Sequence, residues 1–446
     1  CPTRFYGLVV QVAIIRPGPI VGKMMHPYMR RRQKKEAVTY PHPSLEPVLK
    51  RTLGVPLFQE QLLRMAMTVA NFSGAEAEEL RRAVGMRRSW ERMKNLEGKL
   101  RVGMTTNGLD AATQENIIQN ISSFALYGFP ESHAASFALI AYASAYLKVK
   151  YLAAFTCAIL NNQPMGFYMP AVLVKDAQRH GLRVRPIDIQ VSDWACTIEH
   201  EVEGALSLRM GLGYAKGLRR QSAEAVVATR SHDGRFRSAE DLALRVPLLN
   251  RKELTLLARV GALNKLDGIE HRRDALWQVE RAGKLEGPLL RQNSDWLREE
   301  SDALPLAQMN TEERLVADYA GTGLTVGKHP MHYRRQGLQS RNVLSAVELR
   351  LCRDGEYVRA AGCVIARQRP GTAKGFIFIS MEDETGIANV IVTPDLYERE
   401  RLTVVRSKFL LVEGVLQNQD GVIHVKAERI TVLVDHAMEM RSHDFH

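Results

Sequence analysis

The pattern of apolar residues changes its period once along this 446-residue chain, and the change restricts the folds that the chain can form. Up to about residue 345, apolar residues recur mostly at helical spacing between Pro- and Gly-rich breaks. From about Tyr357 the pattern becomes strand-like, in stretches at 358–365, 375–381, 386–392, 409–415 and 422–425. Five short strands in succession suit a small OB-type barrel. The sequence therefore predicts a multidomain α+β protein, mostly helical at first and ending in a small OB-type β-barrel.

The composition excludes several classes of protein. Hydrophobic residues make up 45% of the chain, which is enough for several cores, and we find no stretch suited to span a membrane. The five cysteines are scattered without a C-x-x-C pair, so neither a zinc site nor a disulfide framework is predicted. No signal peptide and no initiator Met stand at the start. We expect a cytoplasmic protein whose chain begins within a longer product.

The positive charge is concentrated near the N-terminus. Residues 1–105 hold 19 Lys and Arg against 8 Asp and Glu, a net charge of +11, whereas the whole chain carries +12. The excess comes in clusters, namely Arg30, Arg31 and Arg32 with Lys34 and Lys35, then Arg81 and Arg82, then Arg87 and Arg88. Such a block predicts a surface that meets phosphates. A solvated basic face that improves solubility is the alternative.

Helix signals accompany these clusters. Apolar residues in the stretch 56–70 lie mostly at helical spacing, and Ser73 with Glu76 forms a capping-box pattern that starts a helix ending at Gly85. The weakly charged run 134–160 predicts one or two buried helices. Ser132 and His133 stand at the expected start of that run, where the free N–H groups of a helix favour anions.

Two glycine-containing segments in the middle of the chain are compatible with the tight loop of a helix-hairpin-helix, which points backbone N–H groups at a phosphate. In the first segment, Gly211, Gly213 and Lys216 are the predicted DNA contacts. The second segment contains Arg259 and Gly261. Short strings of this kind also mark ordinary turns, and the second segment also fits a plain helix end.

In the predicted barrel, Phe376 and Phe378 alternate along one strand, and Arg367, Arg369 and Lys374 precede them. Aromatic side chains that stack on bases, with cations beside them, are typical of barrels that bind single-stranded nucleic acid. The alternative is that both Phe side chains fill the interior of the barrel.

Candidate catalytic carboxylates are missing from the sequence. Two-metal phosphoryl transfer needs two or three carboxylates close together, but the chain contains no Asp-x-Asp. Asp110, Asp176, Asp188 and Asp193 are isolated, and residues 382–384 read as an acidic hairpin turn. We therefore predict no metal ligands in this chain. Taken alone, it favours binding over catalysis.

The chain does offer groups that could hold a polyphosphate. Arg81 and Arg82 end the helix that begins near Ser73, and Arg87 and Arg88 follow Gly85. A guanidinium can bind phosphate oxygens in a bidentate manner and keeps its charge. The alternative for arginines in the last turn is that they only complement the helix dipole.

Five ordered motifs, at 12–19, 53–61, 79–85, 127–137 and 162–168, carry a resemblance to a known family. The chain resembles the bacterial C-family DNA polymerases, the relatives of the replicative polymerase III alpha subunit, and is most similar to their error-prone branch. The resemblance implies polymerase fingers with the end of the palm at 1–160, a helix-hairpin-helix region at 161–290, a connector at 291–345 and an OB-type domain at 346–446. It implies a full-length DNA-directed DNA polymerase that acts in translesion synthesis and damage-induced mutagenesis.

The resemblance also implies roles for single residues. Arg81 and Arg82 match arginines that contact the triphosphate of the incoming nucleotide, and His133, with Ser132 and Tyr127, matches the motif at its sugar and base. The implied DNA contacts also include Arg16, at the junction of palm and fingers. The family's aspartates, which bind Mg²⁺, would lie upstream of Cys1, so we expect this chain alone to be inactive. Residues 86–89 depart from the family pattern.

The implied partners are template and primer DNA and deoxynucleoside triphosphates, and by resemblance alone the sliding clamp and mutagenesis accessory proteins. A second hypothesis remains open, in which the chain is an autonomous single-stranded-DNA-binding repair module without catalysis.

Overall fold

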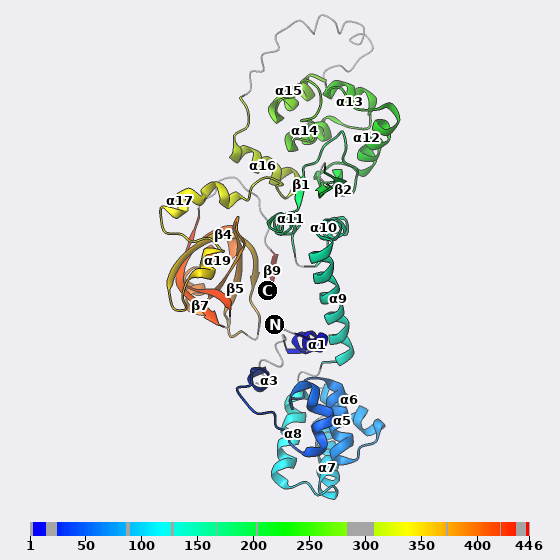
Figure 1. Ribbon diagram of the computed structural model, residues 1–446, viewed down its shortest axis with the longest axis vertical. Coiled ribbons are helices and arrows are strands. Elements are labelled where there is room, and N and C mark those ends of the chain that lie inside the picture. Colours follow the sequence, from blue (N-terminus) through cyan, green and yellow to red (C-terminus); the bar gives the residue numbers. More distant parts are fainter. Residues whose placement is uncertain are drawn as a thin grey trace, which may run out of the picture. The chain divides into compact units, whose positions relative to one another are not determined.

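The computed structural model describes residues 3–14, 25–85, 90–125, 129–166, 168–201, 204–282, 307–371, 373–419, 421–433 and 443–445. The chain divides into two compact units, residues 1–147 and residues 148–446 (Figure 1). Four predicted site residues lie outside the described residues: Arg16, Arg87, Arg88 and Tyr127. The predicted domain boundaries at 160, 290 and 345 stay predictions.

The first unit is helical. Its elements are α1 (Phe5–Ile14), α3 (Met25–Arg32), η1 (Pro43–Leu45), α4 (Glu46–Leu49), η2 (Lys50–Thr52), α5 (Gln59–Ala70), α6 (Gly74–Gly85), α7 (Trp90–Thr106), α8 (Ala111–Ala125) and most of α9 (Glu131–Lys150). Helix α5 packs against α6 and α7 over a core that includes Phe58, Met65 and Leu100. The predicted capping box is confirmed, because Ser73 N donates to Glu76 Oε2 at 3.0 Å and Glu76 N donates to Ser73 Oγ at 3.3 Å.

The run at 134–160 forms two helices, α9 and α10 (Leu152–Asn161), as predicted. The prediction that they are buried is wrong for α9, in which Ala134 and Ala138 are the buried residues, while Phe137 is 50% exposed and Val149 78%. Apolar side chains stand all round this helix. The sequence period therefore could not show which side is covered.

The second unit begins with α10, α11 (Pro170–Arg179) and a small sheet in the order β1-β3-β2, formed by β1 (Arg183–Arg185), β2 (Thr197–His200) and β3 (Leu206–Arg209). After η3 (Leu212–Tyr214) come α12 (Arg220–Asp233), α13 (Ala239–Arg245), α14 (Arg251–Val260) and α15 (Arg272–Ala282). These elements share one apolar core. The capping box of Asn250 and Glu253 fixes the start of α14.

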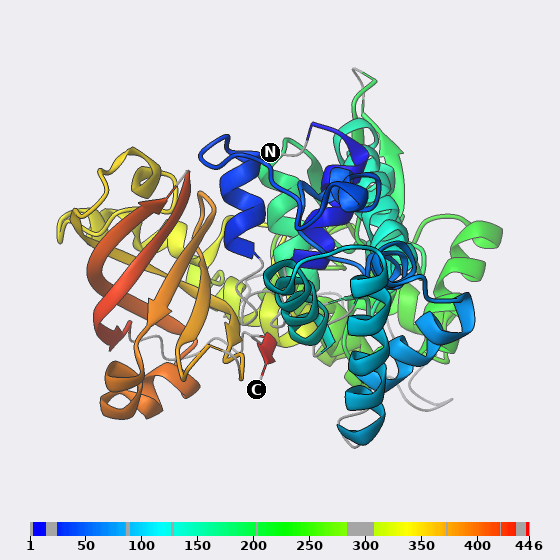
Figure 2. The ribbon, with the colours of Figure 1, turned by 90° about the horizontal axis from the view of Figure 1, so that it is seen from below.

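The second unit continues with α16 (Thr311–Thr322), η5 (Pro330–Arg334), α17 (Arg335–Gln339) and η6 (Glu348–Leu351). A barrel follows, formed by β4 (Tyr357–Gln368), β5 (Ile377–Glu382), β6 (Ile387–Val392), β7 (Phe409–Gln419) and β8 (Val422–Val432), with α18 (Pro394–Arg399) and α19 (Arg401–Arg406) between β6 and β7 (Figure 2). The strand order is β5-β6-β8-β7-β4, and β4 pairs again with β5. Strand β9 (His443–Phe445) runs parallel to β4. The predicted fold class and the five predicted strands are confirmed.

The acidic hairpin turn at 382–384 joins β5 to β6 as predicted, but it is not an ordinary surface turn. Glu382 is 1% exposed and Asp383 is 2% exposed. Arg179 of α11 donates to Glu382 at 2.8 Å, and Arg335 of α17 donates to Asp383 at 3.0 Å. His329 Nε2 lies 3.7 Å from Glu382 Oε2. The turn therefore ties the barrel to α11 and to the connector that precedes the barrel.

Loss of one partner of this buried pair should be costly. Arg179→Met should lower the free energy of unfolding by about 3–5 kcal/mol, because it leaves a buried carboxylate without its cation. Arg183→Met is the matched control, since Arg183 pairs with Glu201 at 3.2 Å from an exposed position, and it should cost about 0–1 kcal/mol. Denaturant unfolding followed by circular dichroism measures both values. Equal losses in the two variants would contradict the role assigned to Arg179.

Candidate nucleotide and nucleic-acid sites

Helices α5 and α9 begin side by side in the first unit. Phe58 and Phe129 form a parallel bridge, and Gln59 N donates to Phe129 O at 3.0 Å. Directly after the bridge, Glu131 N donates to the carboxylate of Glu60 at 2.9 Å. Each helix start carries partial positive charge. An acidic side chain between them is therefore electrostatically favourable.

Ser132 and His133 lie in the first turn of α9, as predicted, and both are exposed. The imidazole of His133 makes edge contacts with two rings, Phe129 at 5.0 Å and Phe137 at 4.6 Å between centroids. These aromatic contacts restrict the position of the imidazole while leaving the residue accessible.

Arg81 and Arg82 lie near the end of α6, are exposed, and share one carboxylate. Arg81 donates to both oxygens of Glu78, at 2.8 and 2.6 Å, and Arg82 donates to Glu78 at 3.3 Å. The hydrogen bond from Arg81 lowers the pKa of Glu78 to about 2. That hydrogen bond, and to a smaller extent the charge of Glu60, raises the pKa of Arg81. The hydrogen bond that Glu60 accepts is the one from the first turn of α9.

A polar cluster beside the start of α9 was missed in the sequence. Tyr6 Oη donates to Glu131 at 2.9 Å, Arg51 lies 3.5 Å from the same carboxylate, and the guanidinium of Arg51 stacks 3.7 Å from the centre of the Tyr6 ring. Burial, followed by the contact with Glu131, raises the pKa of Tyr6. Because Tyr6 and Glu131 are 125 positions apart, no local pattern connects them.

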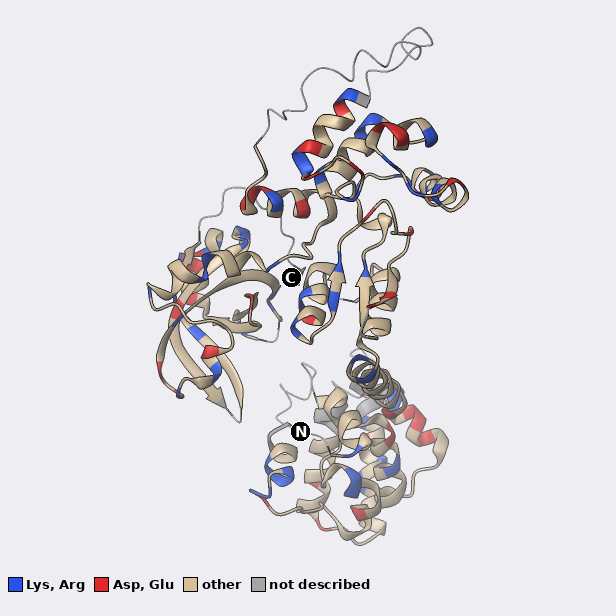
Figure 3. Cartoon of the chain, turned by 45° about the horizontal axis from the view of Figure 1, so that its top comes forward, with Lys and Arg blue, Asp and Glu red and all other residues tan. Residues whose placement is uncertain are grey.

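Lys and Arg are interspersed with Asp and Glu along the helices of both units (Figure 3). In the N-terminal basic cluster, Arg31 has internal partners, whereas the DNA contacts of Arg30 and Arg32 are not tested. Arg31 donates to Leu53 O at 2.8 Å, to Thr39 O at 3.1 Å and to Glu36 at 3.1 Å. These bonds occupy most of its guanidinium and hold the segment after α3, which leaves little of it for DNA. Arg30 is exposed and Arg32 is half-buried, and both DNA contacts stay predictions.

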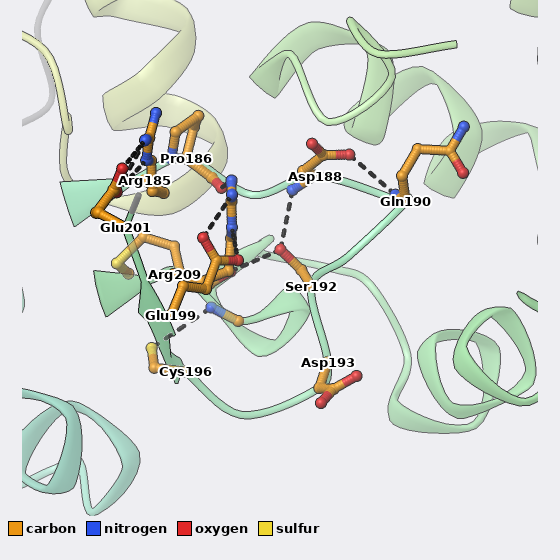
Figure 4. Close-up of polar contacts among 12 residues, drawn as sticks. Arg185, Pro186, Asp188, Gln190, Ser192, Asp193, Cys196, Glu199, Glu201 and Arg209 are labelled. Carbon is orange, nitrogen blue, oxygen red and sulfur yellow. Dashed lines mark hydrogen bonds and ion pairs between the residues drawn. The ribbon is translucent and has the colours of Figure 1, made fainter. Parts of the chain in front are cut away.

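The loop at 211–217 is closed from within. The N–H groups of Gly211, Leu212 and Gly213 donate to Cys196 Sγ at 3.4 Å, Asp193 O at 2.8 Å and Trp194 O at 3.0 Å (Figure 4 draws the Cys196 contact). Lys216 Nζ donates to Tyr319 O at 3.2 Å, at the end of α16. The phosphate contact predicted for Gly211 and Gly213 requires free backbone N–H groups, but both N–H groups already donate within the protein. The side chain of Lys216 connects this loop to α16.

The isolated aspartates have structural partners. Asp188 accepts from Gln190 N at 2.9 Å, Ser192 Oγ accepts from Asp188 N at 3.0 Å, and Asp193 pairs with Arg230 at 3.0 Å (Figure 4 draws the first two). Asp110 caps α8 through Thr113 N at 2.9 Å. In the part of the chain that the structure describes, there is no group of three or more His, Cys, Asp or Glu residues that could hold a metal ion.

The residues of the barrel that were predicted to bind single-stranded nucleic acid differ in their exposure to solvent. Arg367 is buried and donates to Val404 O at 2.7 Å and also to Ser407 O, so it secures α19 to β4. Phe378 is 38% exposed on β5, between the buried Ile377 and Ile379. Phe376 precedes the strand and is half-buried, and Lys374 is exposed. The alternative that both Phe side chains fill the barrel is therefore wrong for Phe378.

The helical first unit, the paired helices and the OB-like barrel each match a known domain family, and together these matches support nucleic-acid binding. Residues 1–108 match the bacterial DNA polymerase III alpha subunit finger domain, residues 181–275 the helix-hairpin-helix motif and residues 358–433 the OB-fold nucleic acid binding domain. No helix among the described residues is long and apolar enough to cross a membrane.

The chain is similar along its whole length to error-prone DNA polymerases. It is 44% identical to the one from Alkalilimnicola ehrlichii and 46% identical to the one from Anaeromyxobacter dehalogenans, over 100% of this chain and 43% and 39% of those proteins. Error-prone DNA polymerase 2 of Rhizobium meliloti is 43% identical over 96% of this chain and 40% of its own length. As the sequence motifs predicted, the chain is similar to polymerases of the error-prone group and carries the finger domain of the polymerase III alpha subunit, and it spans about two fifths of these relatives' length.

Gly211 is required for packing, and its replacement should show this. A Cβ at Gly211 would lie 2.4 Å from the backbone of Ala195, so Gly211→Ala should lower the unfolding free energy by about 1–3 kcal/mol. Gly337→Ala, in α17, is the control, because nothing lies within 4 Å of its added Cβ. The denaturation midpoints of the two variants provide the measurement. If Gly211→Ala weakened DNA binding without any loss of stability, this result would contradict the packing role and support the predicted contact between Gly211 and a DNA phosphate.

Proposed function

We propose that this chain is the nucleotide- and DNA-holding part of an error-prone DNA-directed DNA polymerase that acts in translesion synthesis and damage-induced mutagenesis. The proposal is supported chiefly by the 44% identity to an error-prone DNA polymerase over the whole chain. The location of Arg81, Ser132 and His133 in one compact unit agrees with it.

In the proposed reaction, the primer 3′-hydroxyl attacks the α-phosphate of a nucleotide and pyrophosphate leaves. Arg81 and Arg82 would exchange Glu78 for phosphate oxygens and stabilise the charge that develops on the leaving group. Ser132 and His133 would lie at the sugar and base, together with Tyr127. The described residues do not fit a Mg²⁺ site, because no group of three or more His, Cys, Asp or Glu residues is found among them. By the family resemblance, the Mg²⁺ ions would be bound by aspartates outside this chain.

We propose that template and primer DNA contact the helix-hairpin-helix region and the barrel, as well as Arg16, Arg30, Arg32, Arg87 and Arg88. Single-stranded DNA would stack on Phe378 beside Lys374. The sliding clamp and the mutagenesis accessory proteins are proposed as partners on the family resemblance alone.

A second candidate is the autonomous single-stranded-DNA-binding module. The outward position of Phe378 on an OB-like barrel favours it. The two candidates differ in one outcome, because only the polymerase incorporates nucleotides.

Arg82→Ala in the full-length polymerase should raise the KM for the incoming nucleotide roughly 10- to 100-fold, because a charge-assisted hydrogen bond to phosphate is lost. The affinity for primer–template should stay nearly constant. Steady-state primer extension and a DNA-binding titration measure the two quantities. Arg101→Ala removes a half-buried arginine of the same unit, which pairs with Glu97 at 2.9 Å and with Glu115 at 2.8 Å, and should behave as the wild type in both assays. Unchanged kinetics in Arg82→Ala would contradict the proposed role.

Phe378→Ala should weaken the binding of single-stranded DNA by about 1–3 kcal/mol, the usual contribution of one stacked base. The control Tyr357→Ala removes an exposed aromatic ring at the start of β4, whereas Phe378 pairs with Gln368 at the end of that strand, so the affinity should be unchanged. Filter binding over a salt series measures both. Steep salt dependence with no nucleotide incorporation by the full-length protein would favour the binding module over the polymerase.

A further inference from the structure

Helix α9 lacks a cap of its own. The residue before its first helical residue is Pro130, which has no side-chain acceptor, whereas helices usually begin after Ser, Thr, Asp or Asn. The first N–H group of the helix, that of Glu131, instead donates to the carboxylate of Glu60 at 2.9 Å. The cap of α9 is therefore supplied by α5, from a residue 71 positions away.

The helix that carries Glu60 is also in contact with α6. Helix α5 packs against α6, which carries Arg81. Helix α5 thus contacts the helix of the arginine matched to triphosphate binding, and its Glu60 caps the helix turn that carries Ser132 and His133. The bridge between Phe58 and Phe129 holds the two chain segments in register directly before this contact.

The side chain of Glu131 is fixed independently of its N–H group. It accepts from Tyr6 at 2.9 Å and lies 3.5 Å from Arg51. These contacts come from α1 and η2, so they orient the start of α9 without linking it to α6. The hydrogen bond to Glu60 instead ties the start of α9 to α5, which packs against the helix of Arg81.

We propose that Glu60 is a positioning residue of the nucleotide site, which caps α9 from α5 and thereby fixes Ser132 and His133 relative to Arg81. This inference rests on the proposed polymerase function. It assigns the positioning of Ser132 and His133 to the hydrogen bond that Glu60 accepts from Glu131 N. An amide oxygen can accept the same bond, so glutamine should replace glutamate at this position while alanine should not.

The first experiment compares Glu60→Ala, Glu60→Gln and the wild type in primer extension by the full-length polymerase. Glu60→Ala should lower kcat/KM for the nucleotide about tenfold, the usual effect of one lost hydrogen bond to a charged group. Glu60→Gln should stay within about threefold of the wild type, and primer–template affinity should be unchanged in both. Ser73→Ala is the stability control, since it removes the cap of α6 and leaves the contact between α5 and α9 intact.

The second experiment needs no activity and uses the 446-residue chain itself. Amide hydrogen exchange at residues 131–134 should become faster in Glu60→Ala and stay near the wild-type rate in Glu60→Gln and Ser73→Ala. Unchanged exchange in Glu60→Ala would overturn the proposed cap, whatever the polymerase assay shows.

The outcomes separate this inference from the proposed function. If the wild type incorporates nucleotides and Arg82→Ala impairs it, normal kinetics in Glu60→Ala would overturn the positioning role. If Glu60→Gln were as defective as Glu60→Ala, the charge of Glu60 and not its hydrogen bond would be responsible, which also overturns the inference. A wild-type protein without incorporation would instead contradict the proposed function, and the exchange experiment would still decide whether Glu60 caps α9.

Discussion

The second unit depends on the burial of one acidic turn. Glu382 and Asp383 lie almost wholly out of solvent at the start of the β5–β6 hairpin, where Arg179 and Arg335 neutralise them. A carboxylate taken out of water is stable only while its cation and hydrogen bonds remain in place. The arrangement of barrel, connector and α11 therefore has to be kept for these charges to stay paired, and this part of the chain is fixed by electrostatics as well as by apolar packing.

The same principle divides the charged residues of the first unit into two groups. Arg31, Glu60 and Glu131 are engaged with other elements of the unit, where they hold chain segments together. The exposed Arg81 and Arg82 share the half-buried carboxylate of Glu78, and pairs with such an exposed partner contribute little to stability. Exchange of that carboxylate for phosphate would therefore cost the fold little, as the proposed nucleotide site requires.

Local sequence patterns predicted much of the architecture. The strand stretches in the last part of the chain, the capping box at Ser73 and the two helices after residue 130 all appear in the structure. The polymerase resemblance rests on ordered motifs, which a linear sequence displays directly. The helices of Arg81 and of Ser132 both contact α5, whose Glu60 caps α9. In contrast, Gly211, Arg31 and Arg367 have internal partners.

The sequence by itself determined the order of elements, the OB-like barrel and the family, because helix caps, strand alternation and motifs depend on residues close together in the chain. Only the tertiary structure decided which charged side chains pair with other groups of the protein and which remain accessible to solvent. Arg179 and Glu382 are 203 positions apart, and Glu60 and Glu131 are 71 apart. Such pairs form when folding brings distant segments together, and the free energy of each pair depends on burial, which no local pattern specifies.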